Sequence, residues 1–68
     1  MEILRIVNCR VMKGLGPEWI DKNVTVFLDD IGEWLSESEI NDMVIFDAKE
    51  QLRKAGFIRF NILEITNA

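Results

Sequence analysis

Carboxylates and one cysteine are the side chains of this sequence with the clearest capacity for catalysis, and Asp29 and Asp30 form the most conspicuous acidic pair. Adjacent residues usually point apart, whereas acid–base catalysis needs groups that flank a substrate. One aspartate capping a turn beside a solvated neighbour explains the pair better. Asp29, Asp30 and Glu33 could also hold a magnesium ion, but small carboxylate groups are common in acidic sequences. We therefore expect no cofactor and no metal.

Cys9 is the only possible thiol nucleophile, and its surroundings argue against that role. It lies in the middle of an apolar segment, on the face expected to be buried, and the sequence contains no histidine to activate it. The glycine-containing stretch 14–17 (GLGP) lacks the residues that complete a phosphate-binding loop, so it indicates a turn. With neither catalytic nor metal-binding residues in a recognisable pattern, we expect a binding protein and not an enzyme.

Two apolar segments before residue 30 predict strands. The first covers 3–12, and its odd-numbered face is expected to be the buried one because it carries Ile3, Val7, Cys9 and Val11 beside Arg5. A loop over 13–23 follows, in which Pro17 could open a short helical turn over 18–20. The second strand is expected at 24–28.

A long helix is the most strongly marked element. Ser36 and Glu39 have the spacing of a capping box, which predicts a start near Glu37, and Gly56 marks the end. A short helical turn near 30–35 is expected to precede it, although Gly32 would weaken that turn. The expected buried stripe comprises Ile40, Val44, Ala48, Leu52 and Ala55, widened by Met43 and Ile45.

A third strand is predicted at 57–65. Ile58, Phe60 and Ile62 would share one face, while Arg59 and Asn61 would share the other with Phe57, Leu63 and Ile65. The chain therefore predicts one α+β domain over 1–68, a small three-stranded sheet with one long helix on one face, in the order β-β-α-β.

The composition of the chain limits the class of partner that we expect it to bind. The chain has 68 residues, 49% of them hydrophobic, and a net charge of −4, which suits a basic protein better than nucleic acid. No apolar run approaches the length of a membrane span, so we expect a cytoplasmic protein without a membrane partner.

Trp19 and Trp34 fall outside the apolar patterns, and tryptophan often anchors protein interfaces. Each could instead cover the small core. Trp34 has Asp29, Asp30 and Glu33 nearby in sequence, which would suit insertion into a basic groove, and Asn41 could extend that surface.

The chain resembles the Dmd family, the small antitoxins of T-even phages that neutralise RnlA/LsoA-type endoribonuclease toxins. The resemblance rests on Met1-Glu2 before an apolar strand, Val24-Thr25, Asp29-Asp30-Ile31 leading to Trp34, and Glu39-Ile40-Asn41 at the start of the helix. It implies that Trp34 and Asn41 match the family's tryptophan and asparagine that enter the RNA-binding groove of the toxin. The chain has one extra residue before the tryptophan, a shorter interval to the asparagine and a more hydrophobic last strand.

These features lead to the hypothesis of a phage-encoded inhibitor that occludes the substrate groove of a host endoribonuclease. The main alternative is a sheet-based protein that binds single-stranded nucleic acid through Phe57, Arg59 and Asn61. A small homo-oligomeric structural protein is the third hypothesis.

Overall fold

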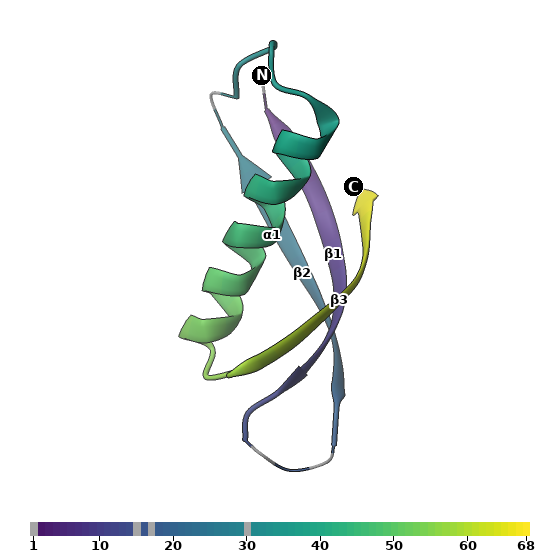
Figure 1. The fold of residues 1–68 in the computed structure, drawn as a ribbon, viewed down its shortest axis with the longest axis vertical. Coiled ribbons are helices and arrows are strands. Elements are labelled where there is room, and N and C mark those ends of the chain that lie inside the picture. Colours follow the sequence, from purple (N-terminus) through teal and green to yellow (C-terminus); the bar gives the residue numbers. More distant parts are fainter. Residues whose placement is uncertain (1, 15, 17, 30) are drawn as a thin grey trace.

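The computed structural model describes residues 2–14, 16, 18–29 and 31–68. Its elements are β1 (Ile3–Met12), β2 (Ile20–Leu28), α1 (Glu37–Lys54) and β3 (Arg59–Asn67). β1 lies in the centre of a three-stranded sheet of order β2-β1-β3 and is antiparallel to both neighbours. The helix crosses one face of the sheet, as Figure 1 shows. The predicted α+β class and the β-β-α-β order are confirmed.

The core lies between α1 and one face of the sheet. Alternating residues of β1 point toward the helix, and the face predicted to be buried is indeed buried at Ile3, Val7, Cys9 and Val11. The helix contributes residues spaced four apart, which form a single stripe along its length: Ile40, Val44, Ala48 and Leu52. The buried residues recur at every second position in the strand and at every fourth position in the helix. These two sets pack together in one apolar layer.

Local sequence explains both ends of α1. At the start, the Ser36 hydroxyl accepts a hydrogen bond from the Glu39 backbone N–H at 3.2 Å, and the Glu39 carboxylate accepts one from the Ser36 N–H at 3.4 Å. At the end, Gly56 has a φ of 95°, and Phe57 donates its N–H to the Leu52 carbonyl at 3.0 Å. This is a Schellman motif, in which glycine accepts the left-handed conformation without steric cost.

The predicted second strand was too short. β2 begins at Ile20, four residues before the predicted start at Val24, and residues 18–19 form no helical turn. Pro17, which was expected to open that turn, lies outside the described residues. The polar residues at the start of β2 extend the strand because the long β1 provides partners for them: Asn23 pairs with Asn8, Lys22 with Cys9 and Asp21 with Arg10.

The predicted third strand began too early and ended too soon, and its faces were partly wrong. Asn8 of β1 pairs with Glu64 whereas Cys9 pairs with Ile62, so Leu63 is an extra residue that forms a β-bulge. The bulge reverses the alternation beyond it. Ile65 consequently pairs with Val7 and packs against the core, instead of sharing a face with Arg59 and Asn61.

Phe57 and Met43 also differ from the prediction. Phe57 precedes β3 and is a core residue, 6% exposed, because the Schellman turn directs it against Leu52. Met43 was expected to widen the buried stripe of α1, but 39% of it is exposed. The side chain of Ile45, the other flanking residue, is half-buried.

Candidate functional site

Trp34 is the most exposed large apolar side chain among the described residues, at 86%. It lies in a turn closed by a hydrogen bond from the Leu35 N–H to the Gly32 carbonyl at 3.3 Å. This turn replaces the short helical turn that was expected near 30–35. The indole folds back over Gly32, since a Cβ placed on Gly32 would lie 2.6 Å from the indole Cζ2. Trp34 therefore rests on backbone at the surface and does not cover the core.

Acidic residues flank this tryptophan in the sequence. Between Lys22 and Lys49 the chain carries no lysine or arginine, while it carries seven carboxylates: Asp29, Asp30, Glu33, Glu37, Glu39, Asp42 and Asp47. Asp29 and Glu33 are exposed, while Asp30 lies outside the described residues. Glu37 and Glu39 are in the first turn of α1, where the helix dipole favours negative charge.

Asn41 lies near the start of α1, at the same end of the molecule as the turn that carries Trp34, and its side chain is half-buried. We use the term Trp34 surface for Trp34, Asp29, Glu33 and Asn41. The end of β2, the turn that follows it and the start of α1 lie at one end of the long axis (Figure 1), so the segments that carry these four predicted residues are neighbours there.

Trp19 belongs to the opposite end of the molecule, beside the loop that joins β1 to β2 (Figure 1). It is 42% exposed, and the Arg59 guanidinium lies 5.6 Å from its ring centroid. Arg59 also approaches the Met12 sulfur at 4.0 Å, and Met12 is only 5% exposed. Trp19 thus helps to cover the open face of the sheet, which is the face away from α1. The structure does not bring Trp19 together with Trp34.

The open sheet face keeps two of the three residues expected of a nucleic-acid surface. Arg59 and Asn61 are exposed there, opposite Met12 and Arg10 of β1. Phe57, which was expected to stack on bases from this face, is instead buried in the core. Arg10 forms an ion pair with Asp21 at 3.2 Å, which lowers the positive charge that this face could offer to phosphates.

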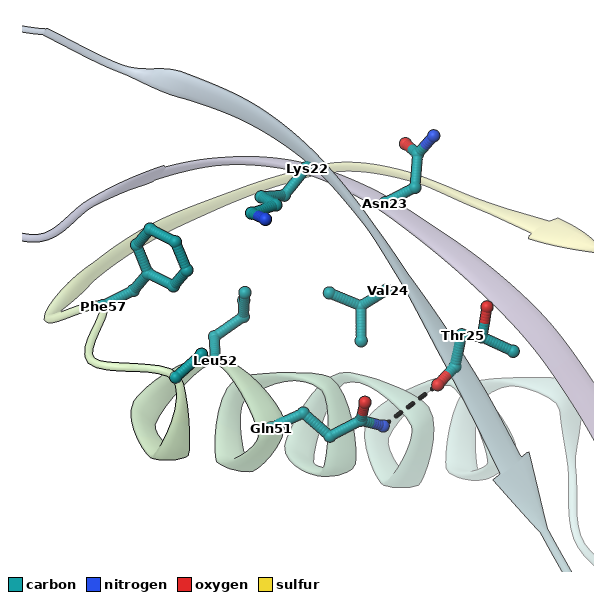
Figure 2. Close-up of a pocket in the computed structure, with 8 residues that line it drawn as sticks. Lys22, Asn23, Val24, Thr25, Gln51, Leu52 and Phe57 are labelled. Atoms are coloured by element: carbon teal, nitrogen blue, oxygen red, sulfur yellow. Dashed lines mark hydrogen bonds between the residues drawn. The ribbon is translucent and has the colours of Figure 1, made fainter.

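A cavity of about 250 Å³ lies between β2 and the C-terminal half of α1 (Figure 2). Gln51 donates its side-chain N–H to the Thr25 carbonyl at 3.0 Å, and Leu52 and Phe57 form the apolar wall. The ammonium groups of Lys13 and Lys22 lie 5.4 and 5.6 Å from the Phe57 ring centroid. These contacts stabilise the end of the core, and the lining holds neither a carboxylate nor a thiol.

Cys9 has the structural role expected of it. Its thiol is buried and donates a hydrogen bond to the Lys22 carbonyl at 3.5 Å. Burial raises the pKa of the Cys9 thiol, because desolvation penalises the thiolate, and a protonated thiol is a poor nucleophile. The sequence also contains no histidine, the residue that usually accepts the proton of a catalytic cysteine.

The described part of the chain also contains no group of three potential metal ligands. None of its helices has the length and apolar character needed to cross a membrane.

Sequence reasoning missed one apolar feature. Phe46 is 68% exposed and lies beside Met43 and Leu28 in a groove on the β2 side of the helix. The signal was an i, i+3 pair, Met43 and Phe46, that does not fit the i, i+4 spacing of the buried stripe.

Comparison with protein-family models, with curated proteins and with solved structures gives no match to this chain.

Proposed function

We propose that this protein is a phage-encoded antitoxin of the Dmd-like kind, which binds a host-defence endoribonuclease in the cytoplasm of the host and occludes its substrate groove without chemistry of its own. The observation that carries the proposal is Trp34, 86% exposed, within a stretch of sequence that has carboxylates and no basic residue.

An indole this exposed supports a binding role because it leaves a large apolar surface in water. Tryptophan dominates many interface hot spots, where the ring enters a desolvated pocket and its N–H finds a partner. Trp34 is ready for such insertion, since it rests on Gly32 and is not part of the core.

Charge supports the class of partner. A ribonuclease groove must attract phosphates, so it is lined by lysine and arginine. Carboxylates pair with the same cations through charge-assisted hydrogen bonds, which lets the Trp34 surface compete with RNA for them. Asp29 and Glu33 are exposed on that surface, and Asn41 adds an amide that can both donate and accept.

The test is an RNA cleavage assay with a purified RnlA/LsoA-type toxin. Adding the protein should suppress cleavage stoichiometrically, and excess RNA should relieve the inhibition because both bind in one groove. Cleavage that continues at full rate in the presence of the protein would rule out this function.

A parallel gel-shift assay with single-stranded oligonucleotides addresses the alternative. The antitoxin proposal expects no complex. A complex that forms with the protein alone and is lost in Arg59→Ala would assign the open sheet face to nucleic acid.

A further inference from the structure

A groove of about 350 Å³ lies between the middle of α1 and the end of β2. Leu28 forms its floor from the strand, and Met43 and Phe46 form its wall from the helix. Asp42 and Asp47 lie at its margins. Leu28 immediately precedes Asp29, so the groove is continuous along the chain with the Trp34 surface.

The folded chain does not need this apolar wall for its own core. The buried residues of α1 already form a complete stripe, and Phe46, six residues from Ile40 and two from Val44, falls outside its four-residue spacing. At 68% exposure, most of its surface faces solvent. Methionine beside it is a flexible side chain that adapts to an incoming surface. These features are typical of a docking site for apolar side chains.

The charges at the margins identify the occupant. Asp47 accepts a hydrogen bond from the neutral Gln51 side chain at 2.9 Å, and within the described ranges neither Asp42 nor Asp47 forms an ion pair with lysine or arginine. Two carboxylates beside an apolar groove favour a segment with basic residues next to an apolar one. A symmetric contact with a second copy is disfavoured, since it would bring Asp42 and Asp47 against the same carboxylates of that copy.

We infer that the groove of Leu28, Met43 and Phe46 docks an amphipathic, basic segment of the protein partner, with an apolar side chain between Leu28 and Phe46 and lysine or arginine on Asp42 and Asp47. The inference rests on the proposed function in one respect only, that this partner is the protein bound by Trp34. The partner would then be held at two sites, one on the turn and one on the helix.

The test uses the complete chain, isotope-labelled for NMR, and a synthetic amphipathic helix of leucine and lysine. Titration should shift the signals of Leu28, Met43 and Phe46 and leave Ile58 and Leu63, two exposed apolar residues elsewhere, unchanged. A matched peptide with glutamate in place of lysine should not bind. Shifts of equal size with the acidic peptide, or shifts confined to other surfaces, would overturn the inference.

Variants separate the groove from the Trp34 surface. Phe46→Ala should weaken peptide binding about tenfold, while Ile58→Ala, which removes an apolar side chain of similar exposure, should leave it unchanged. Trp34→Ala should bind the peptide normally, so failure of the toxin assay and failure of the groove are distinguishable. Sedimentation supplies a further check. A dimer that Phe46→Ala converts to monomer would assign the groove to a second copy and refute docking of a basic segment.

Discussion

The two tryptophans lie at opposite ends of the long axis and have opposite environments. Trp34 is 86% exposed, lies over Gly32 of its own turn and has acidic neighbours in the sequence. Trp19 is 42% exposed, lies under the guanidinium of Arg59 and belongs to the end that carries Lys13, Lys22 and Lys54. The same residue type is therefore exposed at one end of the molecule and packed on the sheet at the other, and the neighbouring residues determine which environment each ring has.

The difference has a structural cause. Trp19 directly precedes β2, so the register of the sheet supplies it with neighbours from β1 and β3. Trp34 lies between β2 and α1, in a segment whose backbone hydrogen bond is local, from Leu35 to Gly32. Long-range pairing makes the first tryptophan part of the fold, whereas the second adds little to stability and remains free to bind.

Trp34→Ala is the change with the largest expected effect on binding. Affinity for the toxin should fall by about 2–4 kcal/mol, or roughly 30- to 1,000-fold, because a desolvated anchor is removed. Thermal stability should hardly change, since the indole contributes no core contact. Calorimetric titration and a thermal melt measure the two quantities. Unchanged affinity would show that Trp34 is not an anchor for the toxin.

Trp19→Ala should have the converse effect. Loss of the ring exposes Met12 and removes the cation–π contact with Arg59, which should lower the free energy of unfolding by about 1–2 kcal/mol. Affinity for the toxin should be retained in the folded protein. Urea unfolding and titration are the measurements, and a loss of affinity equal to that of Trp34→Ala would show that both ends bind.

Gly32→Ala tests whether the present orientation of the Trp34 ring matters for binding. The new methyl group would meet the indole at 2.6 Å, so the ring must leave its present rotamer, at a cost of about 1 kcal/mol in binding. Gly14→Ala is the control, because a Cβ there has no neighbour within 4 Å. Equal titration curves for the two variants would mean that the orientation of Trp34 is unimportant.

Charge at the acidic end should act mainly on the rate of association. Glu33→Gln should slow association about two- to threefold at low salt and have no effect at high salt, because screening removes long-range attraction. Glu18→Gln changes an exposed carboxylate near Trp19 and should leave the rate unchanged. Stopped-flow mixing distinguishes them, and equal slowing by both variants would indicate that only net charge matters.

The smallest effect is expected from Cys9, in the core between the two ends. Because burial raises its pKa above the ordinary value of 9.0, the unfolded chain loses the thiol proton first as pH rises. The associated stability is complete below pH 9.0 and is lost as pH increases through the folded-state pKa. Urea midpoints on both sides of that pH should show this loss in the native chain. The same decline in Cys9→Ala would assign it to other groups.

The helix and the identity of the core could be predicted from short-range patterns. Ser36, Glu39 and Gly56 act within one turn of their own positions, and the stripe of α1 repeats every four residues, so neither depends on distant chain. The buried face of β1 follows from the alternation of Val7, Cys9 and Val11, although Met12 of the other face is buried as well. Trp34 was also recognisable, because it matches neither pattern and stands among acids.

Features that depend on contacts between residues far apart in the sequence could be known only from the tertiary structure. The polar residues at the start of β2 extend the strand because they pair with β1. The bulge at Leu63 turns Ile65 toward the core. In both cases pairing with a neighbouring strand outweighs local preference. The same long-range contacts separated Trp19 from Trp34 and left Phe46 exposed beside Leu28. Composition and spacing determined which elements form, whereas exposure is a property of the assembled sheet and helix, since it depends on which segments cover one another.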